Sequence, residues 1–249
     1  MARNGKIGGG KIDGSVVVIG GANIDVKTRI AGPTVPATSN PGTSATVSAG
    51  GVGRNIAHNL ARLGIATRLI SIVGPDPDGA RLLEETARAG VDIALVKRGK
   101  ASTGLYNAVL DRTGELVIGV SAMAILDELT PADLRKRAAA IDAASFLVAD
   151  CNLRPDCLQW LLARAKRRGI PLLLEPVSVP KAAKLAPLLR AGLRLHTITP
   201  NLNQLEALAG EPLRNASSLR RATRALHGWG IDNILVGLGP KGAALSWRS

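Results

Sequence analysis

Small and polar residues follow the first strand that the sequence predicts. The apolar run at residues 16–19 is followed by residues 20–25 (GGANID), at the carboxyl end of a strand, where open α/β sheets bind ligands. Glycines allow a ligand to approach the backbone closely, and the carboxylate of Asp25 can accept hydrogen bonds from two hydroxyls, as vicinal sugar diols offer them. Polar residues after a strand also satisfy the backbone of a turn, so a binding role and a turn role for Asn23 and Asp25 both stay open.

A second glycine cluster, residues 50–55 (GGVGRN), precedes a predicted helix at 54–63. Backbone N–H groups at a helix N-terminus bind polar ligands, and Asn55 adds a side-chain donor and acceptor. The alternative is a structural turn, but a turn by itself does not explain three glycines in four positions. We therefore favour ligand binding by Gly51, Gly53 and Asn55.

Common motifs for nucleotides, metals and hydrolysis do not occur in the sequence. The glycine spacing at residue 51 reads G-x-G-x-x-I, which is not the dinucleotide fingerprint, and there is no G-x-x-x-x-G-K-[ST]. The histidines and cysteines lack metal-ligand spacing, and no nucleophile elbow is present. These observations argue against a nicotinamide-dependent oxidoreductase, a metal hydrolase and an esterase.

Short apolar runs alternate with helical patterns along the chain, which is typical of βαβ units on a mostly parallel sheet. The predicted strands are 16–19, 69–73, 146–149, 172–174, 195–198 and 234–236. The predicted helices lie near 54–63, 79–89, 155–168, 180–190, 202–209 and 217–228. We therefore expect an α/β fold with a central, mostly parallel sheet flanked by helices.

Two segments depart from this alternation. Residues 27–48 are rich in Thr, Ser, Pro and Ala, and the runs at 105–110 and 115–120 flank a turn with the sequence DRTG, which predicts a β-hairpin. We expect both segments, about 27–48 and 102–120, to form a small β-flap, or lid, over the carboxyl edge of the sheet. Residues 15–249 are then one domain, and residues 1–14 are expected to be a flexible tail.

Composition narrows the possible partners. The 249 residues include 32 Lys and Arg against 19 Asp and Glu, a net charge of +13, and 46% are hydrophobic, which excludes a mainly disordered chain. Aromatic residues make up 2%, too few for the stacking platforms of single-strand nucleic-acid binders, so we expect no nucleic-acid partner. No apolar run approaches the roughly 18 to 20 residues of a membrane span, and only two cysteines occur. We expect a cytoplasmic protein without a membrane partner.

Three further stretches stand in an order and spacing that match a known family. They are residues 72–79 (IVGPDPDG), 199–201 (TPN) and 238–242 (LGPKG). With the loop at 50–55, they make the chain similar to the ribokinase-like (PfkB) family of carbohydrate kinases from about residue 15 to the end. The resemblance implies a ribokinase-like fold and a sugar or nucleoside kinase with ATP and Mg²⁺ as cofactors; a monovalent cation is left open.

Within the family, the chain most resembles pseudouridine kinases. The similarity lies in residues 102–103, 108–111, 114–115 and 150–153, and most specifically in residues 176–181 (PVSVPK). It implies that the acceptor is a ribosyl nucleoside, pseudouridine, whose 5′-hydroxyl takes the γ-phosphate of ATP, with ribose, adenosine and other furanosides as alternatives. The residues that would hold the acceptor are Asn23, Asp25, Gly51, Gly53, Asn55 and, from the closing flap, Thr103, with Asn152 and Lys181 as further candidates.

The resemblance places the nucleotide at the other end of the sheet, near Asn201, Gln204, Gly239 and Gly242. In the family's Asn-x-x-Glu motif, Gln204 takes the place of the acid, so the placement of Mg²⁺ is expected to be weaker. A shifted register, Asn203 with Glu206, also fits the letters. Glu206 is therefore a usable carboxylate for the metal, through a water molecule.

One family motif does not occur in the 249 residues. It is the Gly-Ala-Gly-Asp turn, which in the family supplies the general base and an anion hole for the transferred phosphoryl group. We therefore expect a truncated kinase with exposed apolar sheet surface. A nucleoside-binding or regulatory protein without catalysis is the alternative function, and a homodimer through the exposed edge of the flap is a further expectation.

Overall fold

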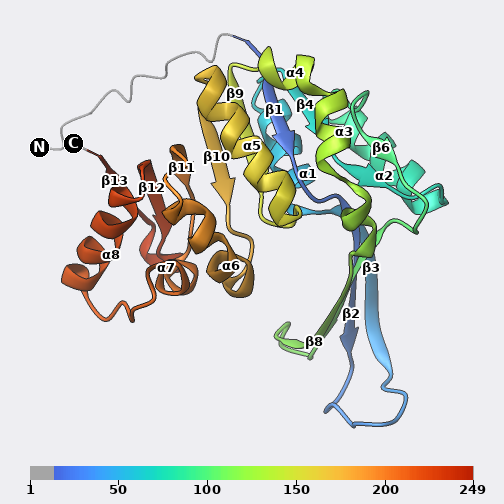
Figure 1. Ribbon diagram of the computed structural model, residues 1–249. Helices are drawn as coiled ribbons and strands as arrows, with labels where there is room; N and C mark the ends of the chain where they lie inside the picture. Colours follow the sequence, from blue (N-terminus) through green and yellow to red (C-terminus); the bar gives the residue numbers. More distant parts are fainter. Residues whose placement is uncertain (1–13, 249) are drawn as a thin grey trace, which may run out of the picture.

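The computed structural model describes residues 14–248, which form a large sheet, a β-flap and flanking helices (Figure 1). The predicted tail, residues 1–14, lies outside the described residues except for Gly14. The large sheet has the strand order β13-β12-β11-β10-β9-β1-β4. Its strands are β1 (Val16–Ile19), β4 (Thr67–Ile70), β9 (Phe146–Asp150), β10 (Leu172–Glu175), β11 (Leu195–Ile198), β12 (Ile231–Gly237) and β13 (Ala243–Trp247).

The strands of the large sheet are parallel except for β13, which pairs antiparallel with β12. The β1 strand lies between β4 and β9, and its four residues (VVVI) are at most 1% exposed. Apolar, β-branched residues suit such a strand because both of its faces are buried. The prediction of a central, mostly parallel sheet is confirmed.

Helices cover the two faces of the large sheet unequally. The helices that pack on one face are α3 (Pro131–Lys136), α4 (Ala138–Asp142), α5 (Pro155–Arg168), α6 (Val179–Arg190), α7 (Leu202–Ala209) and α8 (Ala216–Gly228). The opposite face packs against α1 (Val52–Arg62) near β1. On β12 and β13, Leu235, Leu245 and Trp247 are exposed. Within residues 14–248, no helix combines the length and the apolar character needed to cross a bilayer.

The structure differs from the expected elements at a few places. The strand predicted at 69–73 is two strands, β4 and β5 (Ile72–Val73), because the chain leaves the sheet at Ser71. The Ser71 hydroxyl donates to the Gly20 carbonyl at 2.6 Å, and β5 pairs with β6 (Lys97–Arg98) instead. The short helices α3 and α4, the 3-10 turn η1 (Ala124–Glu128) and β13 were not predicted, because segments this short carry little periodicity.

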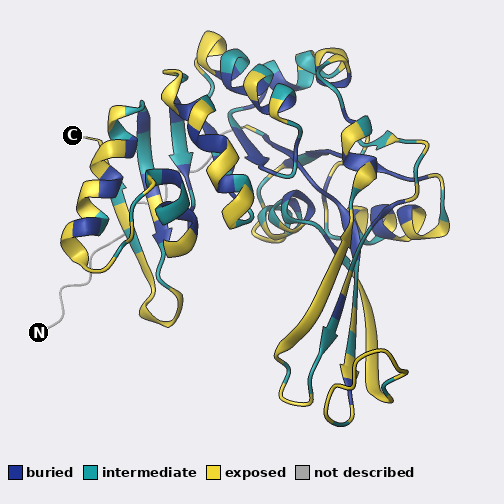
Figure 2. Cartoon of the chain, turned by 60° about the horizontal axis from the view of Figure 1, so that its bottom comes forward, coloured by how far each residue is buried: buried dark blue, intermediate teal, exposed yellow. Residues whose placement is uncertain are grey.

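The flap is a separate four-stranded sheet with the order β3-β2-β7-β8. Its strands are β2 (Asn23–Ile30), β3 (Gly42–Gly50), β7 (Gly104–Leu110) and β8 (Leu116–Ala122). The predicted hairpin is β7–β8, and the carboxylate of Asp111 in its turn accepts from the N–H groups of Thr113 and Glu115. The flap starts at the carboxyl end of β1, as expected, but it extends away from that edge instead of lying over it (Figure 1). Most residues of β3 and β8 are therefore exposed (Figure 2).

The two faces of the flap differ in chemistry. In register, Asn23 and Asp25 of β2 lie opposite Gly104 and Tyr106 of β7, so these residues share one largely polar face. The other face is mainly apolar, with Thr28 and Asn107 as its polar residues. At its root, Ile24 and Leu105 pack with residues of α2 (Pro77–Arg88).

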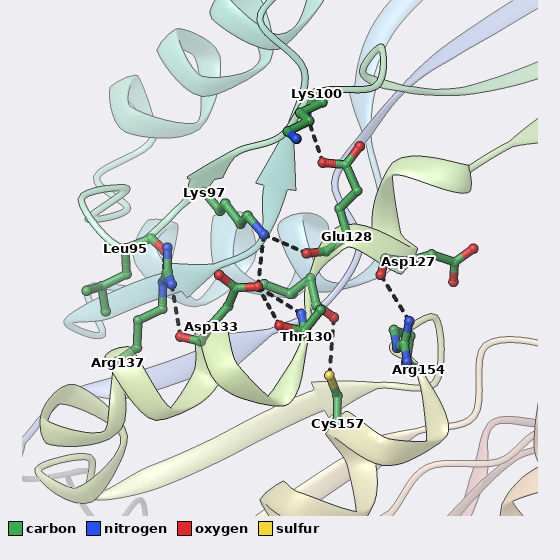
Figure 3. Close-up of polar contacts among 11 residues, drawn as sticks. Leu95, Lys97, Lys100, Asp127, Glu128, Thr130, Asp133, Arg137, Arg154 and Cys157 are labelled. Carbon is green, nitrogen blue, oxygen red and sulfur yellow. Dashed lines mark hydrogen bonds and ion pairs between the residues drawn. The ribbon is translucent and has the colours of Figure 1, made fainter.

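A network of carboxylates fixes the base of the flap hairpin (Figure 3). The carboxylate of Glu128, just after β8, accepts from the backbone N–H groups of Lys100 and Ala101, just before β7, both at 2.8 Å. The Lys97 ammonium donates to the Glu128 carbonyl at 2.6 Å and to the Asp133 carboxylate at 2.9 Å. The two ends of the hairpin are thus tied to each other and to α3.

We predict that Asp133 makes folding stability depend on acid pH. Its burial raises the pKa, but bonds from Lys97 and Thr130 outweigh this effect and lower it to about 2. Because the folded-state pKa is depressed, the contribution is complete above about pH 4 and is lost as the pH falls toward 2. In urea unfolding, Asp133→Asn should lower the free energy of unfolding by about 2 kcal/mol at pH 7, with a smaller gap at pH 2.5.

Asp127, an exposed carboxylate next to Glu128, provides the control for this experiment. Asp127→Asn removes a carboxylate that points away from the network (Figure 3), so it should change stability little at either pH. A gap between wild type and Asp133→Asn that stays constant with pH would contradict this account of Asp133.

Candidate functional site

The carboxylate of Asp150 joins three segments at the carboxyl edge of the large sheet. Asp150 ends β9 and is fully buried. One of its oxygens accepts from the N–H groups of Gly21 at 2.9 Å and Gly53 at 2.7 Å, and the other accepts from the N–H of Asn152 at 2.9 Å. Burial raises the pKa of Asp150, while these donors oppose the rise. The turn after β1, the start of α1 and the end of β9 therefore meet at one side chain.

This junction explains the glycines that the sequence analysis assigned to a ligand. A Cβ on Gly20 would lie 2.4 Å from the Asp150 carboxylate, and one on Gly53 would lie 2.8 Å from the Cα of Gly20. Gly51 has φ +94°, and a Cβ there would lie 2.5 Å from the Gly21 carbonyl oxygen. Contrary to the expectation from the sequence, a structural turn does account for these glycines, because close packing requires them. The N–H of Gly53 is also already bonded, so ligand binding by Gly51 and Gly53 stays a prediction.

Asn23 and Asp25 form a pair of hydrogen-bond acceptors on the polar face of the flap. The Asn23 amide nitrogen donates to one Asp25 oxygen at 2.6 Å, which turns the amide oxygen of Asn23 away. Among the described residues, the other Asp25 oxygen receives no donor. The pair therefore offers acceptor atoms to a ligand with hydroxyl donors. Asn55 is exposed in the first turn of α1, which follows β3 after a connection of one residue, Gly51.

Thr103, the residue before β7, has hydrogen-bond partners within the fold. Its hydroxyl donates to the Asp76 carboxylate at 2.6 Å and accepts from the Gly74 N–H at 3.0 Å. Asp76 also caps α2 through the N–H of Gly79. Burial raises the pKa of Asp76, but the bonds from Thr103 and Gly79 outweigh it and lower the pKa. Thr103 thus fixes the root of the flap, and its contact with an acceptor stays a prediction.

Asn152 and Lys181 meet in the middle of the carboxyl edge. The Lys181 ammonium donates to the Asn152 amide oxygen, which joins the segment after β9 to α6. The two residues border a pocket of about 190 Å³ between α5 and α6 that also contains the side chains of Arg154 and Lys184. The pocket is also lined by Asp127 and several leucines, and Arg154 is paired with Asp156, so only part of its lining suits an anion.

The predicted nucleotide residues gather at the ends of β11 and β12. Asn201 caps α7 by accepting from the Gln204 N–H at 2.9 Å, and the Gln204 amide oxygen accepts from the Asn201 N–H at 2.9 Å. The N–H of Gly237, at the end of β12, donates to the Pro200 carbonyl at 2.9 Å. The turn with Gly239 and Gly242 follows directly. In the strand order, β11 is three strands from β1, a separation of about 14 Å.

The side chains proposed for the metal do not form a direct Mg²⁺ site. The Gln204 oxygen is used in the helix cap, and one Glu206 oxygen accepts from the Leu213 N–H at 2.6 Å, which turns this carboxylate toward the loop after α7. Within residues 14–248, no group of three His, Cys, Asp or Glu residues is placed to hold a metal ion.

The structure adds three residues that the sequence analysis did not single out for the site. They are Asp150, Tyr106 and Glu175. The position of Asp150 at the end of an apolar strand could have indicated it. Tyr106 shares the face of Asp25 only through strand register. The Glu175 carboxylate accepts from the Thr199 hydroxyl at 2.5 Å and the Val177 N–H at 3.1 Å, contacts that a sequence pattern does not reveal.

The fold and the placement of polar residues along the carboxyl edge define an α/β protein of the ribokinase-like type. The profile of the pfkB family carbohydrate kinases matches residues 13–248. The chain is 37% identical over 221 residues to the uncharacterized sugar kinase YeiI of Escherichia coli (strain K12). The aligned region covers 88% of this chain and 59% of YeiI. It is 36% identical over 233 residues to the pseudouridine kinase of the same organism, covering 93% of this chain and 72% of that protein.

A solved structure supports the same fold. The structure of Arabidopsis thaliana ribokinase complexed with ribose and ATP aligns with a TM-score of 0.77 at 23% identity, over 94% of this chain and 75% of the ribokinase. The chain belongs to the PfkB family of carbohydrate kinases. It spans 59% of YeiI and 72% of the pseudouridine kinase.

We predict that Asp150 is required for a stable carboxyl edge. Asp150→Ala leaves three N–H donors without their acceptor, and each unsatisfied buried donor costs about 1–3 kcal/mol. Urea denaturation should show a free energy of unfolding lower by at least about 3 kcal/mol. Asp156→Ala, which removes a half-exposed carboxylate paired with Arg154 after the same strand, should cost less, about 1 kcal/mol. Equal losses in the two variants would contradict the role of Asp150.

Proposed function

We propose that this PfkB protein transfers the γ-phosphoryl group of ATP to the 5′-hydroxyl of a ribosyl nucleoside, with pseudouridine as the acceptor. The observation that carries the proposal is the Asn23–Asp25 acceptor pair at the carboxyl edge of a PfkB fold. The 36% identity to a pseudouridine kinase, over 72% of that protein's length, supports the choice of acceptor.

The arrangement along the sheet edge supports a binding mode for the two substrates. The free oxygens of Asp25 and Asn23 accept from the ribose hydroxyls, and the nucleotide lies near Asn201 and the Gly239–Lys241 turn. Between them, after β9 and β10, lie Asn152 and Lys181. The Lys181 ammonium can stabilise negative charge on the phosphoryl group, and catalysis of this transfer depends mainly on such positioning and electrostatics.

The flap and the metal have supporting roles in the proposal. Flap movement toward the edge would exclude water from the reacting groups, which limits hydrolysis of ATP. Mg²⁺, when bound with ATP, neutralises phosphate charge. Glu206 and Gln204 would reach it through water, because the Gln204 amide oxygen and one Glu206 oxygen already have backbone partners.

A second candidate function is nucleoside or sugar binding without catalysis. The observation that favours it is that the Gln204 amide oxygen and one Glu206 oxygen, expected near the metal, accept from backbone N–H groups, whereas the acceptor pair keeps available oxygens. The two functions differ in one result, since both require acceptor binding but only the kinase consumes ATP.

We predict that Asp25 controls acceptor affinity. In isothermal titration, pseudouridine should bind the wild type saturably, and Asp25→Asn should raise its dissociation constant at least about tenfold, because a carboxylate accepts hydroxyl bonds more strongly than an amide. Asp78→Asn, an equal charge change at an exposed position on α2, should have little effect.

The same preparations are then incubated with Mg²⁺ and ATP, with pseudouridine, uridine, ribose or adenosine as the acceptor. Release of ADP that depends on pseudouridine supports the kinase, and saturable binding without ADP release supports the binding protein. Absence of binding by every acceptor would contradict both functions.

We also propose that two copies of the chain pair through the apolar face of the flap. On this face, Val47, Leu116, Ile118 and Val120 are 44–56% exposed, and the strand register places the polar side chains of Asn107 and Thr28 among them. The root of the same face is covered by α2, so only its outer half needs a partner. The flap of a second copy exposes the same apolar residues, so the two flaps can pack against each other.

Sedimentation velocity tests the pairing. The wild type should sediment as a dimer at micromolar concentration, and Ile118→Lys should shift it to the monomer because it buries a charge in the interface. Glu115→Lys, at the hairpin turn beyond this face, should stay dimeric. A monomeric wild type would disprove the pairing.

A further inference from the structure

Arg54 is a buried cation close to the Asn23–Asp25 acceptor pair. It follows Gly53 in α1, and only 6% of its surface is exposed. Its guanidinium bonds to the Ala49 carbonyl at 3.3 Å, the Asn55 amide oxygen at 3.1 Å, the Thr86 hydroxyl at 3.0 Å and the His58 Nδ1 at 3.2 Å. Burial lowers the pKa of Arg54, and the charges of Glu85 and Asp25 oppose this effect.

Two of these bonds come from a single nitrogen, Nη1, and they join the end of β3 to the start of α1. One goes to the carbonyl of Ala49 and the other to the side chain of Asn55. Ala49 pairs with Ile24, and the next pair along the strands is Gly50 with Asn23. The same guanidinium therefore holds the backbone next to the acceptor pair and the neighbouring carboxamide.

The bond to Asn55 determines which end of its carboxamide is available. A carboxamide can present either its oxygen or its NH₂ group to a ligand. Because Arg54 donates to the Asn55 oxygen, the NH₂ group is the end that remains for a ligand. Arginine has only donors, so the reverse orientation would place two donors against each other.

We propose that Arg54 is a positioning residue that fixes Asn55 as a hydrogen-bond donor beside the two acceptors, Asp25 and Asn23. A ligand that satisfies this set has a group that both donates and accepts, as hydroxyls do, and a ligand with acceptors alone does not. The consequence for the acceptor rests on the proposed function above. The orientation of Asn55 itself does not depend on it.

The bond from Arg54 to Thr86 serves for packing and does not involve Asn55. Its Nε donates to the Thr86 hydroxyl, which in turn donates to the Leu82 carbonyl at 2.6 Å. These two bonds attach Arg54 to α2. Thr86→Val removes this anchor without touching the bond to Asn55, so it separates packing from positioning.

The orientation of Asn55 can be measured in the ligand-free protein. Asn59 lies one turn further along α1 and is also exposed, so it is an internal reference. In ¹⁵N relaxation, the side-chain amide of Asn55 should be clearly more rigid than that of Asn59 in the wild type. A mobility equal to that of Asn59 would overturn the proposal without the need for any variant.

Substitution then tests whether Arg54 is the cause. Arg54→Lys keeps the charge but cannot reach both Ala49 and Asn55 in the same geometry, so the Asn55 amide should become as mobile as that of Asn59. Thr86→Val should leave it rigid. An Asn55 amide that stays rigid in folded Arg54→Lys would overturn the proposal.

Acceptor affinity provides the functional readout through a double-mutant cycle. Arg54→Lys should weaken pseudouridine binding about tenfold in the wild-type background, and much less in the Asn55→Ala background, because the effect acts through Asn55. Equal losses in both backgrounds would overturn the positioning role. If the wild type binds no nucleoside or sugar, the proposed function fails, and the relaxation measurement still decides the role of Arg54.

Discussion

The carboxyl edge of the sheet depends on one buried carboxylate. Asp150 accepts three backbone N–H groups from the turn after β1, the start of α1 and the segment after β9. Since no backbone donor can be left unpaired in a buried position without a large cost, the three segments are held in one arrangement. The acceptor pair follows the first segment, Asn55 follows the second, and Asn152 belongs to the third, so the geometry of the proposed acceptor site follows from this junction.

Several residues that look like binding residues in the sequence have structural partners in the fold. Thr103 is bonded to Asp76, Gln204 to the cap of α7, and Gly53 to Asp150. These contacts fix the loops in place, while Asp25 and Asn23 keep acceptor atoms without partners among the described residues. The site is therefore built from a rigid frame and a small number of available groups, an arrangement that favours precise positioning of substrates.

The fold could largely be predicted from the sequence, because buried strands and amphipathic helices leave strong local patterns. The hairpin β7–β8 was also predictable from its turn residues. The reason for the glycines was not, since the packing partners of Gly53 are Gly20 and Asp150, and Asp150 is 97 residues away in the chain. The direction of the flap likewise depends on tertiary contacts at its base, such as those of Glu128, which carry no sequence period.

The ribose of a nucleoside is expected to bind at the Asn23–Asp25 pair, and a crystal structure of the protein with pseudouridine would show whether it does. We expect the ribose 2′- and 3′-hydroxyls within hydrogen-bond distance, about 2.5–3.0 Å, of the Asp25 carboxylate, with the Asn55 NH₂ group donating to one of them. A nucleoside bound elsewhere, for example in the pocket between α5 and α6 and away from Asp25, would show that this pair does not hold the ribose.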